Sequence, residues 1–359
     1  MIKTIDWYII KKYLGTFFFS MAVFTLIMIV FDISERLDDF LKRHAPLDLI
    51  IFQYYAGFIP FYLNFLSPLI NFIAVIFFTA KMADQTEIVP MLTGLMSFNR
   101  VLRPYFLAAT VIFIITLIFN LFIIPETNKL KIAFENVYVS PSETSSKLST
   151  HMQLDPHTFV YIHDFDNQTD IGYQFALEKF NGDTLKEKLV ANSIVWDSIK
   201  RGWNIRDYSI RYIDGLKEKM AYGAQKDTIL DMHPADFESY DNVYSAMNMT
   251  ELNERIEKEK IRGTGVIVNL RIEQYRRFIN PFSTYVLTLM GVSLSSRKVR
   301  GGIGLPLGIG ITLCFIYIVA IQFSTMFALK GGLPPLIAVL IPNIIFGLLG
   351  VYLLFKAPK

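Results

Sequence analysis

The sequence predicts an α-helical membrane protein with an all-β domain inserted in its middle. The chain has 359 residues, 52% of them hydrophobic, and its mean hydropathy is +0.37. Only 19% of the residues are charged, below the roughly 25% of soluble domains. Eight of the 32 acidic residues precede Pro125, none follows Arg277, and the remaining 24 lie between. Both ends of the chain therefore resemble lipid-embedded segments, whereas the middle resembles a water-soluble domain.

Six uncharged runs predict six transmembrane helices, because a helix needs roughly 20 mainly apolar residues to cross a bilayer. The runs are Tyr13–Phe31, Leu49–Ala80, Tyr105–Ile124, Phe278–Ser296, Ile303–Leu329 and Leu333–Phe355. The second run is long enough to cross with tilt and contains Pro60 and Pro68. The fourth is the weakest of the six, because it contains Asn280, Pro281 and several hydroxyl side chains.

Lysine and arginine in the short connections orient these helices, because cytoplasmic connections carry an excess of both residues. With the N-terminus in the cytoplasm, the cytoplasmic side holds Lys3, Lys11, Lys12, Lys81, Arg100, Arg103, Arg297, Lys298, Arg300, Lys356 and Lys359. The opposite short connections hold only Arg36, Lys42, Arg43 and Lys330. Both termini are therefore predicted to be cytoplasmic and the insert extracytoplasmic. Arg276 and Arg277 then lie at the outer mouth of the fourth helix, against the bias, but long domains translocate largely regardless of charge.

The insert, residues 126–265, separates transmembrane helices 1–3 in residues 1–125 from helices 4–6 in residues 266–359. Its aromatic and β-branched runs predict strands at Thr158–Asp164, Tyr173–Lys179, Leu189–Asp197 and Gly202–Asp214. Short strands at intervals of roughly ten to fifteen residues indicate an antiparallel sandwich or a jellyroll-like domain. The densely charged segment Glu251–Arg262 predicts a solvated amphipathic helix at its end. A further helical stretch, Leu270–Arg277, is expected to continue into the fourth transmembrane helix.

Sequence patterns that would carry catalysis or hold a cofactor are missing. No phosphate-binding Gly-x-x-x-x-Gly-Lys-Ser/Thr motif occurs, so ATP hydrolysis would need a separate subunit. The spacing of His151, His157 and His163 fits no compact metal site, and no serine lies on a nucleophile elbow. The single cysteine, Cys314, cannot form an internal disulfide or a cysteine-based metal site. A net charge of +3 implies no field for nucleic acid.

A charged cluster at the outer end of the first helix is the first candidate binding site. Arg36, Asp39 and Arg43 are three and four residues apart, so they share one helix face, and Lys42 lies beside them. One interpretation is a solvated helix end with internal ion pairs. The alternative is a strip that binds an anionic amphiphile, with its phosphates contacted by Arg36, Lys42 and Arg43.

The cytoplasmic connection between the second and third helices is the second candidate site. Apolar residues recur there at spacings of three and four, which predicts a short amphipathic helix near residues 84–98. Its apolar positions are Ile88, Val89, Met91, Leu92, Leu95 and Met96. Such a helix either anchors the connection to the membrane surface or docks into a groove on a partner protein.

Four short segments, in this order along the chain, carry a resemblance to a known family. They are the opening Ile5–Lys12, then Thr86-Glu87-Ile88 followed by Leu92–Ser97, then Arg276-Arg277 with Pro281, and finally Gly332–Pro335 with Leu340–Asn343. Together with the number of predicted helices and the place of the insert, they resemble the lipopolysaccharide export permease family, LptF/LptG. The four segments are similar to the family's Asp-Arg-Tyr start, its coupling segment, its entry to the fourth helix, and its final loop with the sixth helix. The first-helix strip and the Pro-Pro loop resemble LptG more than LptF.

The resemblance implies a non-enzymatic permease subunit, without cofactors, in an ATP-driven transporter of the bacterial inner membrane. Two related LptF/LptG-like subunits pair, a cytoplasmic LptB-like ATPase dimer binds the coupling helices, and lipopolysaccharide passes to a single-span LptC-like protein and a periplasmic LptA-like bridge. By this resemblance Glu87, Met91 and Gly94 belong to the ATPase-coupling segment. The lipid-binding residues it implies, with two arginines at the rim, are Arg36, Asp39, Lys42, Arg43, Arg276 and Arg277.

Two other classes of function remain open at this stage. An enzyme acting on envelope lipids would need a catalytic pair near the outer face, and the only candidate residues for such a pair are His151, His157 and His163. A scaffold or receptor that senses ligands through the insert would not require a cytoplasmic docking helix. Recovery of an ATPase subunit with the purified protein separates both from the permease.

Overall fold

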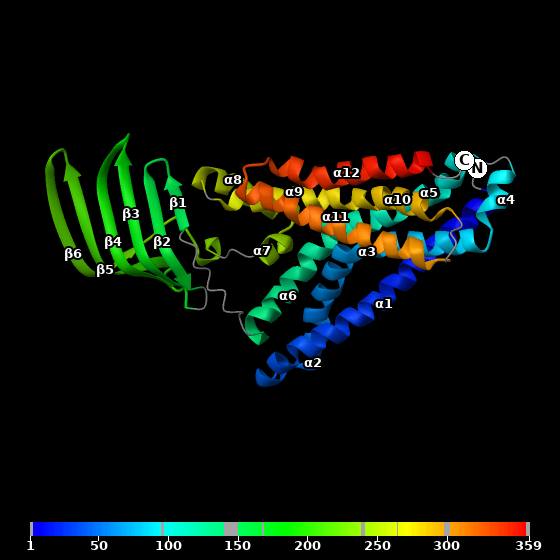
Figure 1. Ribbon diagram of the computed structural model, residues 1–359. Helices are drawn as coiled ribbons and strands as arrows, with labels where there is room; N and C mark the ends of the chain where they lie inside the picture. The colour runs from blue at the N-terminus through cyan, green and yellow to red at the C-terminus, as the bar shows by residue number, and fades with distance from the viewer. Residues whose placement is uncertain are drawn as a thin grey trace. The chain divides into compact units, whose positions relative to one another are not determined.

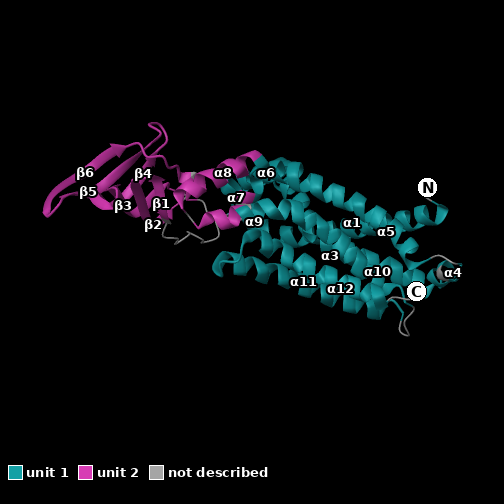
Figure 2. Cartoon of the chain, turned by 90° about the horizontal axis from the view of Figure 1, so that it is seen from above, with its two compact units in different colours: residues 1–139, 245–249, 271–359 teal, residues 140–244, 250–270 magenta. Residues whose placement is uncertain are grey.

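The computed structural model describes residues 3–94, 97–139, 150–166, 169–237, 241–263, 265–297 and 302–356. Of the residues named above, Leu95, Met96, Lys298, Arg300 and Lys359 lie outside these ranges. The chain divides into two compact units, shown in different colours in Figure 2. We call residues 1–139, 245–249 and 271–359 the helical unit, and residues 140–244 and 250–270 the sheet unit.

Five helical segments are long and apolar enough to cross a membrane (Figure 1). They are α1 (Thr4–Lys42), Leu47–Asp84, Phe98–Tyr138, α11 (Gly304–Lys330) and α12 (Pro335–Lys356). The second joins α2 (Leu47–Leu49), a π-helical segment (Ile50–Tyr55) and α3 (Ala56–Asp84). The third joins α5 (Phe98–Ile118), a π-helical segment (Phe119–Ile123) and α6 (Ile124–Tyr138). Five of the six predicted transmembrane helices are thus confirmed as long apolar helices.

The segment predicted as the fourth transmembrane helix is interrupted. α9 (Val266–Ile279) ends at a 3₁₀ turn (Asn280–Phe282), and α10 (Ser283–Ser295) follows it. Pro281 lies in this turn; it lacks the backbone N–H that a continuous α-helix would use. α10 spans about 20 Å at 1.5 Å per residue, less than the ~30 Å of a bilayer core. A sixth crossing by this segment therefore stays a prediction.

The helical unit is built around α3 and α10. One cluster of buried apolar side chains joins α1, α3, α5 and the short helix α4 (Ile88–Thr93), and another joins α3, α10, α11 and α12. Only 6% of the most apolar window of α1 is buried, against 44% for the segment that contains α3. Most of α1 therefore presents apolar side chains to lipid or to another subunit. At 1.5 Å per residue its 39 residues span about 58 Å, so α1 extends well beyond a bilayer core.

The insert forms one six-stranded antiparallel sheet in the order β1-β2-β3-β4-β5-β6. Its strands are β1 (Thr150–Asp155), β2 (Thr158–Asp166), β3 (Ile171–Asn181), β4 (Thr184–Asp197), β5 (Gly202–Asp214) and β6 (Lys217–Thr228). The β-domain and its place in the chain are confirmed. The prediction missed β1 and β6, the two edge strands, because a mostly polar edge strand lacks apolar alternation. Each described strand pairs with its neighbours in sequence, so the connections form a meander rather than the crossovers of a jellyroll.

The helical unit includes residues up to 139 because the third long helix continues through Tyr138. The sheet unit has its own core, which runs along the sheet from Leu177, Leu189 and Ile210 to Trp203. The buried Trp203 packs against Phe165 and Phe237 and donates a hydrogen bond from its indole Nε1 to the carbonyl of Met232 at 2.9 Å.

An ion network attaches helix α8 (Met249–Arg262) to the end of the sheet unit. Asp236 ends a 3₁₀ turn (Pro234–Asp236) and is paired with both Arg255 and Arg262, the latter at 2.8 Å. Glu259 lies 3.1 Å from Arg255 and 3.6 Å from Arg262. All four charged side chains are largely buried, so the segment predicted as a solvated helix has one buried, charged face.

Candidate functional site

Towards its C-terminal end, α1 carries a buried carboxylate that two tyrosines and an arginine contact. Asp32 accepts hydrogen bonds from the hydroxyls of Tyr54 at 2.7 Å and Tyr55 at 3.0 Å. Nε of Arg36 lies 3.4 Å from the same carboxylate. Both tyrosines belong to the π-helical segment, a local irregularity often found at functional sites. A single carboxylate thus joins α1 to the start of the second long helix.

Helix α6 contributes a second acid and a second base to this group. Nη2 of Arg36 lies 3.6 Å from Glu135, and Nζ of Lys131 lies 3.7 Å from the same carboxylate. Lys131 is buried, with its ammonium 5.4 Å and 5.5 Å from the ring centroids of Phe61 and Tyr62. We call Asp32, Arg36, Tyr54, Tyr55, Lys131 and Glu135 the outer charge cluster. Its two acids balance its two bases, as the burial of charged side chains requires.

The structure distributes the four predicted residues of the first-helix strip among different surroundings. Arg36 belongs to the outer charge cluster, whereas Lys42 is exposed and lies 3.8 Å from Asp38. Arg43 donates a hydrogen bond to the carbonyl of Val137 at 2.9 Å, and Asp39 is half-buried. An exposed ion pair such as Lys42–Asp38 contributes little to stability and leaves the lysine accessible to an anion.

The two rim arginines bind protein groups. Arg276 donates from Nη2 to the hydroxyl of Thr325 at 2.9 Å. Arg277 is only 3% exposed, and its Nε lies 3.1 Å from Glu273 on the preceding helical turn. Arg277 is therefore buried beside an acid, whereas Arg276 remains half-exposed.

Sequence reasoning missed four members of the outer charge cluster, Tyr54, Tyr55, Lys131 and Glu135. Adjacent tyrosines inside a long uncharged run, and a lysine four residues before a glutamate beyond the third apolar run, are signals that could have marked them. The partnership of these residues with Asp32 and Arg36 has no local signal, because it joins segments far apart in sequence.

At the opposite end of the helical unit, α4 lies near both chain termini (Figure 1). α3 ends in a Schellman motif: the N–H of Glu87 bonds to the carbonyl of Met82 at 2.9 Å, and that of Thr86 bonds to Ala83 at 3.1 Å. Thr86 occupies the left-handed position of this motif with φ of +57°. The motif turns the chain sharply and sets Glu87 immediately before α4.

Helix α4 is shorter than the predicted amphipathic helix, which was placed near residues 84–98, and spans Ile88–Thr93 only. Ile88 is buried, and Met91 packs against the core beside it. Val89, Pro90 and Thr93 are exposed on the other side, and Gly94 ends the helix. Of the predicted coupling residues, Met91 therefore faces the protein's own core and Gly94 is exposed.

The side chain of Glu87 is held by the first helix. It accepts hydrogen bonds from the hydroxyl of Tyr8 at 2.9 and 3.1 Å and from Nζ of Lys12 at 3.3 and 3.4 Å. Close by, Arg100 at the start of α5 forms two hydrogen bonds with Asp6, at 2.7 and 2.6 Å. The candidate coupling site is thus a connection tied to the first turns of α1.

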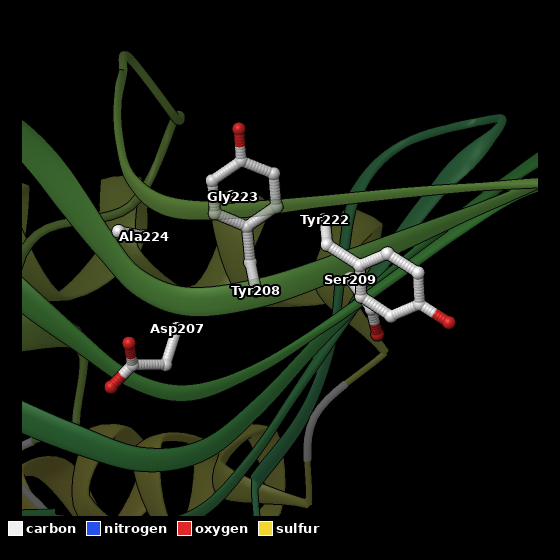
Figure 3. Close-up of a pocket in the computed structure, with 6 residues that line it drawn as sticks. All are labelled: Asp207, Tyr208, Ser209, Tyr222, Gly223 and Ala224. Carbon is white, nitrogen blue, oxygen red and sulfur yellow. The ribbon is translucent and has the colours of Figure 1, made fainter.

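The sheet unit has an open depression of about 590 Å³ on β5 and β6. Figure 3 shows the ring of Tyr208 standing over Gly223, with Asp207 on the other side of the strand. Asp207 has φ of +51° and interrupts the pairing of β5. Asp207 is the only charged residue of the six that line the depression, and none of the predicted site residues lies there.

The histidines weighed for an enzyme lie on the sheet with few partners. His163 Nδ1 is 2.9 Å from the hydroxyl of Tyr161, and the ring of His151 packs against the same tyrosine. His157 lies in the turn between β1 and β2, where its backbone N–H bonds to Asp155. Within the described ranges, no three His, Cys, Asp or Glu residues are grouped to hold a metal ion.

Comparison with known proteins gives one full-length match. The family described as lipopolysaccharide export system permease LptF/LptG matches residues 7–356. No curated protein matches the chain.

Proposed function

Because this chain belongs to the LptF/LptG family of lipopolysaccharide export system permeases, we propose that it is the permease subunit of an ATP-driven transporter. It extracts lipopolysaccharide from the inner membrane and passes it to a periplasmic bridge towards the outer membrane. The observation that carries the proposal is the family match over residues 7–356. The absence of a nucleotide-binding motif from the sequence agrees with a separate ATPase subunit.

In this proposal both termini and α4 are cytoplasmic, and the insert is periplasmic. The described end that holds α4 and the termini carries Lys3, Lys11, Lys12, Lys81, Arg100 and Arg297. An LptB-like ATPase dimer docks there, on the exposed side of α4. A second LptF/LptG-like subunit, an LptC-like protein and an LptA-like bridge complete the pathway. The exposed apolar surface of α1 supports lateral pairing with another subunit.

Glu87→Lys is expected to lower recovery of the ATPase subunit with the purified permease by tenfold or more. The substitution reverses the charge immediately before α4 and removes the carboxylate that Tyr8 and Lys12 hold. Co-purification from detergent-solubilised membranes measures the effect, with Asp48→Lys, an exposed acid at the other end of the helical unit, as control. If the Glu87 variant recovered as much ATPase as the wild type, Glu87 would not belong to the docking site.

The first-helix strip is proposed to contact the phosphates of lipopolysaccharide, with Arg36, Asp39, Lys42 and Arg43 as its residues and Arg276 and Arg277 at the rim. Arg36→Glu with Arg43→Glu is expected to lower photo-crosslinking to lipopolysaccharide severalfold, because two cations become anions. Arg36→Glu also places a third acid beside Asp32 and Glu135. Lys42→Glu with Arg43→Glu therefore tests the strip without disturbing the outer charge cluster.

The matched control for this experiment is Lys330→Glu, an exposed cation at the end of α11. It lies on the same predicted side of the membrane but outside the strip. If crosslinking were unchanged in both double variants, we would conclude that the strip is a solvated helix end.

The two alternatives find less support. A lipid-modifying enzyme would need a base oriented towards a nucleophile. His163 lies 2.9 Å from the hydroxyl of Tyr161 and 3.9 Å from Asp164, but His163 and Asp164 are about half exposed, and Tyr161 with Asp164 forms no recognisable nucleophile–base pair with it. A scaffold or receptor remains the second candidate, and it would purify without an ATPase.

A further inference from the structure

The connection between α3 and α5 is attached to α1 at both of its ends. At its beginning, Glu87 accepts hydrogen bonds from Tyr8 and Lys12. At its end, Arg100 is paired with Asp6 through two hydrogen bonds. Three residues within the first turns of α1 therefore hold a connection that lies 75 to 94 residues further along the chain.

The two attachments use different sides of α1. Asp6 continues the buried face that Ile9 and Tyr13 form at helical spacing. Tyr8 and Lys12 are four residues apart and share another side of the helix. α1 is thus held on two sides, by the start of α4 and by the start of α5, and cannot turn about its axis without breaking one attachment.

The attachments differ in strength. Asp6 and Arg100 form a bidentate pair around a buried carboxylate, the strongest type of side-chain pairing. Lys12 and Glu87 are each about one-third exposed, at 34% and 29%, and their distance of 3.3 Å is that of a partly solvated pair. The contact at α5 is therefore the stronger of the two, whereas the contact at α4 is partly open to solvent.

We propose that Tyr8 and Lys12 are positioning residues of the coupling connection. They hold the Glu87 carboxylate against α1, so that a displacement of α4 also displaces the first turns of α1. This inference rests on the proposed function in assuming that an ATPase docks at α4. Tyr8 and Lys12 each contact both carboxylate oxygens of Glu87, and the side chain is still 29% exposed, so a cation of the partner can reach it.

As a consequence, a single helix, α1, links the two candidate sites. α1 runs from Tyr8 and Lys12 at one end to Asp32 and Arg36 at the other as a single unbroken α-helix. An uninterrupted helix moves as a rigid element, so displacement of its first turns reaches the outer charge cluster. Tyr8 and Lys12 therefore determine whether ATP-driven movement of α4 is coupled to lipid release.

The test uses the full-length chain with Ile88→Cys as a reporter. Ile88 is the first residue of α4 and only 3% exposed, so reaction of the cysteine at this position with a membrane-impermeant maleimide reports separation of α4 from the core. The native Cys314 is buried and gives a low background. Lys12→Met is expected to increase the labelling rate at least threefold. Lys12→Arg, which keeps the charge, and Lys11→Met, which removes the neighbouring exposed lysine, are expected to label at the reporter's own rate.

The functional arm uses the same substitutions in the purified complex, without the reporter. Lys12→Met is expected to leave ATPase recovery and ATP hydrolysis within twofold of wild type but to lower lipopolysaccharide release at least fivefold. A loss of stability alone would lower all three together. If Lys12→Met leaves both the labelling rate of the reporter and the release of lipopolysaccharide unchanged, the proposal is overturned.

The charge exchange Lys12→Glu with Glu87→Lys distinguishes the two roles of Glu87. Slow labelling of the exchanged pair, with ATPase recovery still low, supports both positioning by α1 and docking by Glu87. Fast labelling of the exchanged pair overturns the positioning role. If no ATPase co-purifies even with the wild-type chain, the proposed function fails, whereas the labelling experiment still decides whether Tyr8 and Lys12 hold the connection.

Discussion

Replacing Gly57 by alanine is expected to separate α3 from α6 and to destabilise the helical unit. A Cβ atom at position 57 would lie 2.4 Å from the backbone oxygen of Thr127 and 2.6 Å from Cβ of Lys131. Neither atom can move by side-chain rotation, so the helices themselves must shift. Overpacking of this kind costs about 1–3 kcal/mol, and more where backbone must move. Lys131 would shift with α6, so the outer charge cluster would lose the contacts of Lys131 and Glu135.

Thermal unfolding of the purified protein in detergent measures this effect. Gly15→Ala is the matched control, because a Cβ atom there meets nothing within 4 Å and alanine favours a helix over glycine by roughly 0.5–1 kcal/mol. We expect Gly57→Ala to lower the unfolding temperature by several degrees and Gly15→Ala to leave it unchanged or higher. Equal temperatures for the two variants would contradict the close approach of α3 and α6.

Asp236→Ala is expected to detach α8 from the sheet unit. The substitution leaves the buried Arg255 and Arg262 with Glu259 as their only acidic partner within the network. Removing one partner of a buried ion pair costs about 3–5 kcal/mol. Because Glu259 still pairs with both arginines, we expect a cost at the lower end of this range, about 3 kcal/mol. Loss of hydrogen-exchange protection in α8 measures it. Glu218→Ala, which removes an exposed ion pair with Arg211, is the control and should have little effect.

The same network makes the sheet unit sensitive to acid. Burial acts to raise the pKa of Asp236, but the hydrogen bond from Arg262, the charge of Arg255 and the N–H of His233 outweigh it and lower the pKa. A carboxyl whose pKa is lowered by folding stabilises the fold above its unfolded pKa, roughly 3.9, and this stabilisation is lost as pH falls through the folded value. Protection of α8 should therefore decline below about pH 4 in the wild type, and Asp236→Ala should show none of this contribution.

The sequence predicted the helical architecture because transfer of an apolar run into a bilayer depends on local composition alone. Five of the six predicted runs lie within long apolar helices, and the insert is a sheet. The edge strands β1 and β6 were missed because both are mostly polar, and the few residues that reach the core, such as Met152 and Ala221, do not make a visible apolar alternation. Pro281 was visible, but whether it would bend or end the helix depended on the packing around Asn280–Phe282.

The sequence by itself determined where apolar helices and the β insert lie, which residues are charged near each end of α1, and the family to which the whole pattern is similar. Only the tertiary structure decided the partners of those charges. Asp6 with Arg100, Glu87 with Lys12, and Arg36 with Glu135 join residues far apart in the chain. Such pairs leave no local periodicity, because a charged side chain is oriented by the nearest opposite charge that helix packing brings within reach, and burial then penalises every alternative.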